Sequence, residues 1–243
     1  DDVPDADAIV VPTGGAGLLA GVAVAAKARR PDIQIIAVEA AAAASFTASL
    51  AAGKPVDVPV RPTLADGLAV GRVGDRAFAL AAPRVDRVQT VDERELSLAV
   101  LRLLELEKTS CEGAGAAALA ALMGEVGQEF KGRKVVLLLC GGNIDPTVLH
   151  RVIDHGLAVD GRLWRFTATV RDRPGGIAKL TQVIADAGAS VLEINHDRAF
   201  SGPEVFSTTV EVTVETADQD HIQALREQLR EADFGITSAT GSR

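Results

Sequence analysis

The stretch AIVVPTGGAGL, residues 8–18, decides the fold class of the first half of this chain. Its first four residues are apolar, as in a strand that a parallel sheet buries on both faces. The glycines then turn the chain into an Ala-, Leu- and Val-rich helix that is expected to end at about Arg30, because Pro31 follows. Small residues at such a turn let backbone N–H groups converge on an anion, and the helix dipole favours negative charge there. The stretch therefore predicts a phosphate-binding loop, although such turns also serve packing alone.

Alternating strand and helix patterns continue to about residue 150. The expected strands are 33–38, 87–91 and 134–139, and the expected helices are 40–52, 92–108 and 112–126. Strand 134–139 is expected to be the most clearly buried, and the polar segment 56–74 is expected to be a loop. Strands separated by helices of this length form a parallel sheet, whose ligands lie at the carboxyl ends of the strands. The first half of the chain is therefore expected to be an α/β domain with its site at that edge.

From Arg162 onward the pattern becomes the alternation of half-buried strands, beginning with Trp164 and Phe166. The elements expected after this first strand are an amphipathic helix containing Ile177 to Ile184, strands at 190–194 and 205–214, a helix at 220–231 and a short strand around Ile236. The order β-α-β-β-α-β is the ferredoxin-like α+β arrangement. We therefore expect two domains, 1–159 and 160–243.

The composition of the chain excludes several classes of function. With a net charge of −8 and scattered basic residues, the chain is expected to bind neither nucleic acid nor a membrane surface. The uncharged run 8–26 approaches the length of a membrane span, but the glycines in its middle favour a strand, a loop and a helix. Cys111 and Cys140 make neither a disulfide framework nor a metal cluster, and the first residues lack the basic start of a signal peptide. We therefore expect a cytoplasmic protein.

Residues 11–21, VPTGGAGLLAG, resemble the glycine-rich phosphate loop of the serine/threonine dehydratase family. These enzymes use pyridoxal 5′-phosphate (PLP) and have fold type II, a tryptophan synthase β-like domain of three αβα layers. Further segments follow in the family's order: ADGLAV at 65–70, EGAGA at 112–116 and LCGGNI at 139–144. The resemblance covers about residues 1–150. It implies a threonine ammonia-lyase, which converts L-threonine into 2-oxobutanoate and ammonia by PLP-dependent β-elimination.

The resemblance also implies which residues hold the cofactor. It assigns the phosphate to the backbone of Gly14, Gly15, Ala16, Gly17 and Leu18. Ala16 stands where the family usually has a third glycine, and we expect its backbone donor to be kept provided that its φ is negative.

Near the ring of the cofactor, the resemblance places Gly67 and Glu112, with Cys140 facing the pyridine nitrogen. A neutral thiol, unlike a carboxylate, does not stabilise a protonated ring nitrogen. The negative charge of a carbanion is therefore less delocalised into the ring, and this favours rapid loss of a β-hydroxyl. Considered alone, Cys140 also fits a buried apolar cysteine after a strand.

A cation site near the loop is implied as well, because a glutamate and the residues four and six positions later supply oxygen ligands in the family. Glu39, Ala43 and Ser45 have this spacing, with Ala43 contributing its carbonyl. Oxygen ligands suit a hard ion such as K⁺ or Mg²⁺, and the uncharged Ser45 favours the monovalent one. A glutamate that faces solvent after a strand is the alternative.

In the second domain, the segment DRPGG at 172–176 resembles the signature of ACT regulatory domains, and 195–198 resembles single-ACT threonine ammonia-lyases. The resemblance implies a homo-oligomer that binds an amino-acid effector, isoleucine or valine, whose carboxylate meets helix-start N–H groups. The residues expected at the effector site are Asp172, Gly175, Gly176, Leu192 and Asn195. A plain turn and helix cap is the alternative for 172–176.

The family's Schiff-base lysine lies in a Ser-x-Lys-x-Arg-Gly-like motif upstream of the glycine loop, and none of the six lysines here has that context. Either the chain is a fragment or another chain supplies the rest. We therefore expect the chain to be the C-terminal portion of the enzyme, inactive by itself and without a catalytic residue of its own.

Two alternatives stay open. A serine dehydratase, serine racemase or hydroxyaspartate dehydratase would share these motifs, because substrate choice depends heavily on the upstream region. The ACT resemblance favours threonine, since feedback by a branched-chain amino acid belongs to isoleucine biosynthesis, although a catabolic enzyme also fits. The alternative of another class is a non-catalytic, amino-acid-binding regulatory module with a degenerate catalytic remnant.

Overall fold

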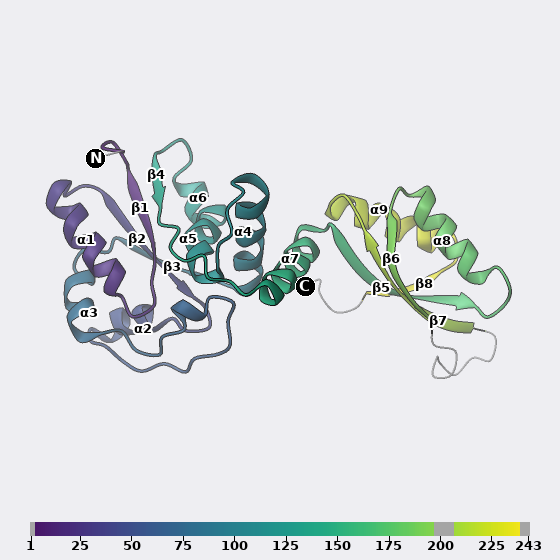
Figure 1. Cartoon of the computed structure of the whole chain (residues 1–243), viewed down its shortest axis with the longest axis horizontal. Helices are drawn as coiled ribbons and strands as arrows, with labels where there is room; N and C mark the ends of the chain where they lie inside the picture. The colour runs from purple at the N-terminus through teal and green to yellow at the C-terminus, as the bar shows by residue number, and fades with distance from the viewer. Residues whose placement is uncertain (1–2, 197–206, 239–243) are drawn as a thin grey trace. The chain divides into compact units, whose positions relative to one another are not determined.

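The structure, a computed structural model, describes residues 3–196 and 207–238 (Figure 1). The chain divides into two compact units, Asp1–Gly156 and Leu157–Arg243. The boundary expected between residues 159 and 160 falls three residues beyond this division, inside helix α7. Asp197, Arg198 and the expected strand start at 205 lie outside the described residues.

The first unit is a parallel sheet in the strand order β3-β2-β1-β4 with helices on both faces (Figure 1). Its strands are β1 (Ala8–Pro12), β2 (Gln34–Ala40), β3 (Arg87–Val91) and β4 (Val135–Leu137). Its helices are α1 (Gly17–Arg29), α2 (Ser45–Ala52), α3 (Asp75–Ala81), α4 (Glu93–Leu106), α5 (Gly113–Met123), α6 (Glu125–Glu129) and α7 (Pro146–Asp160), with a 3₁₀ turn η1 (Asp66–Leu68). One buried cluster joins α1 and α3 to the sheet, and a second joins α4 and α5 to its other face. The expected three-layer αβα arrangement is confirmed.

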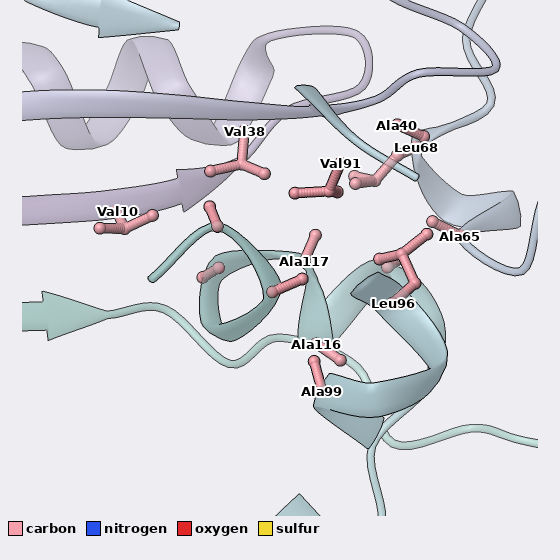
Figure 2. Packing of buried hydrophobic residues seen from close by; sticks show 14 of the residues in the cluster. Val10, Val38, Ala40, Ala65, Leu68, Val91, Leu96, Ala99, Ala116 and Ala117 are labelled. Atoms are coloured by element: carbon pink, nitrogen blue, oxygen red, sulfur yellow. The ribbon is translucent and has the colours of Figure 1, made fainter. Parts of the chain in front are cut away.

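The Ala-rich helix α5 packs directly on the sheet. Ala116 and Ala117 of this helix belong to the same buried cluster as Val10, Val38 and Val91, which come from three strands. Figure 2 shows Ala116 beside Ala99 of α4, on the side of the helix away from these valines. Small side chains let the helix backbone approach the sheet closely, and a helix that is apolar all round has to be buried. This packing fixes the start of α5 near the carboxyl ends of the strands.

Strand β4 is shorter and less buried than the sequence predicts. It contains three residues rather than the expected run 134–139, each is half-buried, and it pairs with β1 at the edge of the sheet. An apolar run does not reveal whether a strand is central or at an edge, because its neighbours come from distant segments. The expectation of a fully buried strand is wrong.

The helix expected at 40–52 begins five residues later, at Ser45. Ala40 still belongs to β2, and the N–H of Ala41 donates to the carbonyl of Val91 at 2.9 Å. Pairing with β3 therefore outweighs the helix propensity of the alanine run. Helices α3 and α7 were also missed by the sequence analysis.

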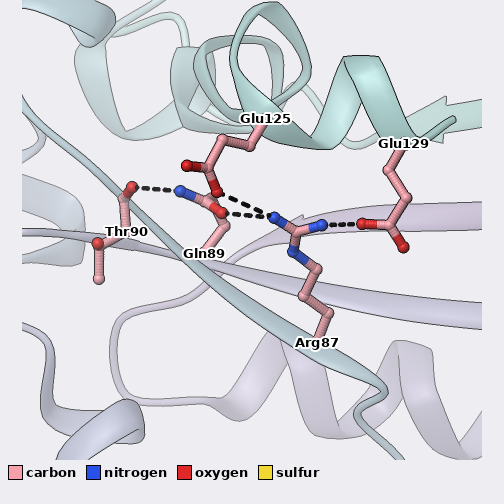
Figure 3. Close-up of polar contacts among 5 residues, drawn as sticks. All are labelled: Arg87, Gln89, Thr90, Glu125 and Glu129. Carbon is pink, nitrogen blue, oxygen red and sulfur yellow. Dashed lines mark hydrogen bonds and ion pairs between the residues drawn. The ribbon is translucent and has the colours of Figure 1, made fainter. Parts of the chain in front are cut away.

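The edge strand β3 is joined to α6 by a cluster of polar side chains (Figure 3). The guanidinium of Arg87 contacts Glu129 and lies 3.4 Å from Glu125, and it donates to the side chain of Gln89 at 3.1 Å. Isolated exposed ion pairs contribute little, but one ordered guanidinium serves several partners here. The cluster holds α6 beside a sheet edge that would otherwise be open to pairing.

The second unit is an antiparallel sheet in the order β6-β7-β5-β8 with two helices (Figure 1). Its elements are β5 (Leu163–Arg171), α8 (Gly176–Asp186), β6 (Ser190–His196), β7 (Ser207–Glu215), α9 (Gln219–Glu231) and β8 (Gly235–Ser238). Phe166 and Val212 of the sheet are buried together with Leu180 of α8 and Leu225 of α9. The expected ferredoxin-like α+β fold is confirmed.

The uncharged run 8–26 forms β1, a turn and most of α1. Over residues 3–196 and 207–238, no helix is both long enough and apolar enough to cross a membrane.

Candidate functional site

A cavity of about 250 Å³ lies where the chain leaves β1 and enters α1. Its lining comes from four separate segments: Pro12, Gly14, Gly15, Ala16, Gly17, Leu18, Gly67, Leu68, Glu112, Ala114 and Cys140. All eight residues that the sequence analysis assigns to the cofactor are among them. Three further residues that were not expected there also line the cavity, each within two positions of an expected one: Pro12, Leu68 and Ala114.

The loop between β1 and α1 is anchored to the sheet and leaves its own donors available. The N–H of Thr13 donates to Val38 at 2.7 Å, and its hydroxyl donates to the carbonyl of Val11 at 3.0 Å. Within the described residues, the backbone N–H groups of 14–18 donate to no protein acceptor. Unpaired amides at the start of a helix are suited to an anion such as a phosphate.

Ala16 caps the start of α1 with φ 64° and ψ 8°, in the left-handed region. The condition of a negative φ is therefore not met, because the turn from the strand into α1 places a left-handed residue at this position. An L-residue in that region costs about 1–2 kcal/mol relative to the right-handed one. The backbone donor of Ala16 is nevertheless present at the cavity.

Two glycines of the cavity lining lie where separate segments approach one another closely. A Cβ on Gly14 would lie 3.1 Å from the carbonyl oxygen of Gly67, and a Cβ on Gly67 would lie 3.1 Å from the Cβ of Ala114. Side chains at either position would fill the space between the loop, η1 and the start of α5. The glycines therefore keep a narrow slot open in the cavity.

Glu112 and Cys140 reach the cavity from adjacent segments. The N–H of Glu112 donates to the carbonyl of Gly141 at 3.2 Å, and the thiol of Cys111 donates to the same oxygen at 3.1 Å. Cys140 is exposed, whereas Cys111 is the buried cysteine, so the alternative of a core role for Cys140 is wrong. Partial desolvation, and then the nearby Glu112 carboxylate, raise the pKa of the Cys140 thiol, which is therefore held neutral.

Glu39 does not face solvent, because its side chain is fully buried. Its carboxylate accepts hydrogen bonds from the N–H of Phe46 at 2.6 Å, the N–H of Thr47 at 2.8 Å and the hydroxyl of Thr47 at 2.6 Å. Desolvation raises the pKa of Glu39, and the hydrogen bonds from Thr47 and Phe46 only partly oppose it.

Ala43 and Ser45 lie between Glu39 and the body of α2. The N–H of Ser45 donates to the carbonyl of Ala43 at 2.9 Å. The hydroxyl of Ser45 is fully buried and has no hydrogen-bond partner among the described residues. No group of three or more His, Cys, Asp or Glu side chains that could hold a metal occurs in the part of the chain that the structure describes.

In the second unit, Gly175 and Gly176 line a separate cavity of about 560 Å³ between the end of β5, the start of α8 and the turn before β8. Gly175 has φ 94°, and a Cβ on Gly176 would overlap the carbonyl of Arg171. Asp172 follows Arg171 but is not among the lining residues, and Leu192 and Asn195 lie on β6 at the opposite edge of the sheet from β8.

Four charged residues that were not expected at the effector site also line this second cavity: Arg171, Arg173, Lys179 and Asp233. Lys179 donates to the carbonyl of Ala232 at 2.9 Å and lies over the ring of Phe234. Asp233 lies 3.6 Å from the guanidinium of Arg171. Only the fold brings residues 171–179 and 232–235 together, so no sequence spacing could have pointed to both.

The residues around the first cavity fit PLP. Free amides at a helix start suit the phosphate, the glycine-lined slot suits a flat ring, and a neutral thiol suits an unprotonated ring nitrogen.

Comparison with protein families gives two matches. Residues 1–141 match the family described as pyridoxal-phosphate dependent enzymes, and residues 166–234 match the ACT domain. The chain is similar to the L-threonine ammonia-lyases of Thermotoga maritima and Geobacter sulfurreducens, with 38% and 42% identity over 229 residues. Each alignment covers 94% of this chain and 57% of the relative, so the chain spans a little over half the length of these proteins.

Solved structures resemble part of this chain. Threonine deaminase isoform 2 from Solanum lycopersicum is 34% identical, with a TM-score of 0.59 over 62% of this chain and 44% of the other. Maize serine racemase is 36% identical, with a TM-score of 0.58 over 62% of this chain and 48% of the other. Since the family match spans most of the α/β unit, including the lined cavity, the chain belongs to the pyridoxal-phosphate dependent enzymes and carries an ACT domain after the enzyme portion.

Proposed function

We propose that this chain is the C-terminal portion of a threonine ammonia-lyase that converts L-threonine into 2-oxobutanoate and ammonia. The observation that carries the proposal is the cavity, which brings together all eight expected cofactor residues from separate segments. The alignment with two L-threonine ammonia-lyases over 94% of the chain supports it, because that alignment spans both units.

Bound PLP would supply an electron sink that makes the α-proton of an amino acid acidic and lets the β-hydroxyl leave. The amides of 14–18 and the positive end of α1 would hold its phosphate. The thiol of Cys140, held neutral by its raised pKa, would offer the ring nitrogen a hydrogen bond and no charge. No lysine is among the described residues that line the cavity, and the proposal takes the attachment lysine from upstream of this chain.

The test is an assay of the protein that contains this chain together with its upstream segment. It should show PLP absorbance and release equal amounts of 2-oxobutanoate and ammonia from L-threonine. A protein that binds amino acids but shows neither PLP absorbance nor ammonia release would be the non-catalytic regulatory module instead.

A serine-directed enzyme is the second candidate, favoured by the similarity of 62% of this chain to maize serine racemase. The two functions differ in product, because serine gives pyruvate on elimination or D-serine on racemisation. Faster turnover of L-serine than of L-threonine in the same assay would decide for this candidate.

A monovalent cation, K⁺, completes the proposed site beside Glu39. The support is the buried hydroxyl of Ser45, because a buried polar group without a partner costs about 1–3 kcal/mol. One oxygen of the Glu39 carboxylate accepts a single hydrogen bond and has a lone pair left, and the carbonyl of Ala43 is a third oxygen nearby. Neutral oxygen ligands around one carboxylate suit K⁺ better than Mg²⁺.

The ACT domain is proposed to bind an aliphatic amino acid, isoleucine or valine, and to pair with a second copy. The turn at 172–176 supports effector binding because two of its glycines line a cavity. Strand β6 supports pairing because it is an edge strand and its residue Leu192 is 55% exposed. In such a pair, Leu192 and Asn195 of one copy would reach the turn of the other.

The proposed location is the cytoplasm, because the two cysteines are free and a reducing compartment keeps them so.

A further inference from the structure

We infer that Glu93, at the start of α4, is a positioning residue for the cofactor cavity; the inference rests on the proposed function. One carboxylate oxygen accepts a hydrogen bond from the hydroxyl of Thr63 at 2.5 Å, and the other accepts one from the N–H of Leu64 at 2.8 Å. Hydrogen bonds to an ionised carboxylate are shorter and stronger than neutral ones. A single side chain of α4 thus holds two successive residues of the 56–74 loop.

The held residues lead directly to the cavity wall. The N–H of Ala65 donates to the Thr63 hydroxyl oxygen at 3.2 Å, and the carbonyl of Ala65 accepts from the N–H of Leu68 at 2.8 Å. This second bond closes η1, whose residues Gly67 and Leu68 line the cavity. The position of that wall is therefore set from Thr63 onward.

The space around this segment tolerates little movement. A Cβ on Gly113 would lie 2.5 Å from the carbonyl oxygen of Leu64, so the start of α5 packs directly on the held backbone. On the other side, Gly14 approaches the carbonyl of Gly67 closely. A shift of the loop by a few tenths of an ångström would either narrow the slot or separate η1 from the phosphate loop.

Capping of α4 does not explain the carboxylate of Glu93. The side chain of Asp92 accepts hydrogen bonds from the N–H groups of Arg94 and Glu95, and the side chain of Glu95 accepts from the N–H of Asp92. This capping box is complete without Glu93. Both oxygens of Glu93 instead serve the loop, in which η1 is the one regular element described.

The experiment compares Glu93→Ala, Glu93→Gln and Glu95→Ala in this chain. Loop order is measured by amide hydrogen exchange at residues 64–68. Binding is measured with 4′-deoxypyridoxine 5′-phosphate, which has the phosphate and ring of PLP but no aldehyde, so it forms no adduct with surface lysines. Unfolding temperature is recorded for each variant.

Glu93→Ala should speed exchange at 64–68 by about tenfold and weaken probe binding by about fivefold or more, since two charge-assisted hydrogen bonds are lost. Glu93→Gln should restore both, because its carbonyl can accept from Leu64 while its NH₂ donates to the Thr63 oxygen. Glu95→Ala, which breaks the capping box, should lower the unfolding temperature about as much as Glu93→Ala does. It should nevertheless leave loop exchange and probe affinity within about twofold of the wild type.

Wild-type exchange or wild-type affinity in Glu93→Ala overturns the inference, and so does equal weakening by Glu95→Ala, which would mean that both act through α4. If the wild-type chain binds no probe, the proposed cofactor site is wrong, and so is the inference about Glu93. If the wild-type chain binds the probe tightly and Glu93→Ala binds it equally well, only the inference about Glu93 is wrong.

Discussion

The backbone N–H of Glu112 donates to the carbonyl of Gly141 at 3.2 Å, and this bond joins the start of α5 to the segment after β4. Gly141 has φ 120°, and a Cβ there would overlap the Glu112 side chain. A glycine is therefore required for the two segments to meet. Their meeting brings Glu112 and Cys140, the only described lining residues with ionisable side chains, to the same cavity.

Replacing Cys140 by aspartate in the complete enzyme should lower threonine deamination by about tenfold or more, because a carboxylate would favour a protonated ring nitrogen and a longer-lived carbanion. Affinity for the phosphate-bearing probe should change by less than about threefold, since the loop amides are untouched. The rate of 2-oxobutanoate release and the yield of racemised threonine measure the effect. Cys140→Ser, neutral like the thiol, is the matched control, and equal rates for both variants would show that Cys140 does not face the ring.

Replacing Ala16 by glycine should stabilise this chain by about 0.5–1 kcal/mol, because glycine adopts the left-handed φ of 64° without strain. The gain is smaller than the full strain, since glycine also loses more backbone entropy on folding. Urea unfolding gives the difference in free energy. Ala20→Gly, inside α1, is the control and should destabilise by about 1 kcal/mol; destabilisation by both would mean that Ala16 is not left-handed.

The free energy of unfolding should depend on pH through Glu39. Burial raises its pKa above the ordinary value of 4.5, so the folded chain holds the proton more tightly than the unfolded chain. The resulting stability is fully present below the ordinary pKa and is lost as the pH rises through the folded pKa. Between pH 4 and pH 8, Glu39→Gln should therefore gain stability relative to the wild type as the pH increases. Urea unfolding measures the free energy of both proteins at each pH. A difference between Glu39→Gln and the wild type that does not change with pH would contradict the raised pKa.

Potassium should reduce the loss of stability that Glu39 causes as the pH rises, because a cation beside Glu39 stabilises the ionised carboxylate and lowers its pKa. At pH 8 the wild type should be more stable in KCl than in choline chloride of equal ionic strength. Ser45→Ala should remove the difference by deleting the hydroxyl that lacks a partner. Identical stability in the two salts would argue against the cation site.

Replacing Gly175 by aspartate should abolish binding of isoleucine or valine to the ACT domain, because a carboxylate would repel the ligand's own carboxylate at the start of α8. Titration calorimetry of this chain measures the heat. Gly188→Asp is the matched control, since Gly188 also has a left-handed φ and open space around it but does not line the cavity. If both variants lose the binding heat, backbone strain and not the added charge explains the loss. If both variants keep the binding heat, the effector binds elsewhere.

Borohydride reduction of this chain after soaking with PLP should leave no stoichiometric adduct at one site, because no lysine lines the cofactor cavity among the described residues. Peptide mapping by mass spectrometry should find only weak, scattered labelling over the six lysines. One fully labelled peptide would show that this chain carries its own attachment lysine.

Most of the fold could be predicted from local patterns. The apolar run, the glycine-rich turn and the Ala-rich segment predict β1, the loop and α1. They do so because periodicity and turn chemistry depend only on residues that are close together in the sequence. The helix expected at 92–108 is also present, and Asp92, its first expected residue, forms the cap of α4. Boundaries failed where pairing between distant strands decided them, as at β4 and at the start of α2.

Sequence motifs predicted that eight named residues would share one site, because each residue lies in a motif that can be recognised without its neighbours in space, and these eight residues line one cavity. Three features are visible only in the folded chain: the burial of Glu39, the left-handed backbone of Ala16, and the buried hydroxyl of Ser45, which has no partner among the described residues. Only the fold joins Glu93 to Thr63. Burial, backbone strain and contacts between distant segments depend on which surfaces pack together after folding. A local pattern of residues does not specify which distant segments those surfaces belong to.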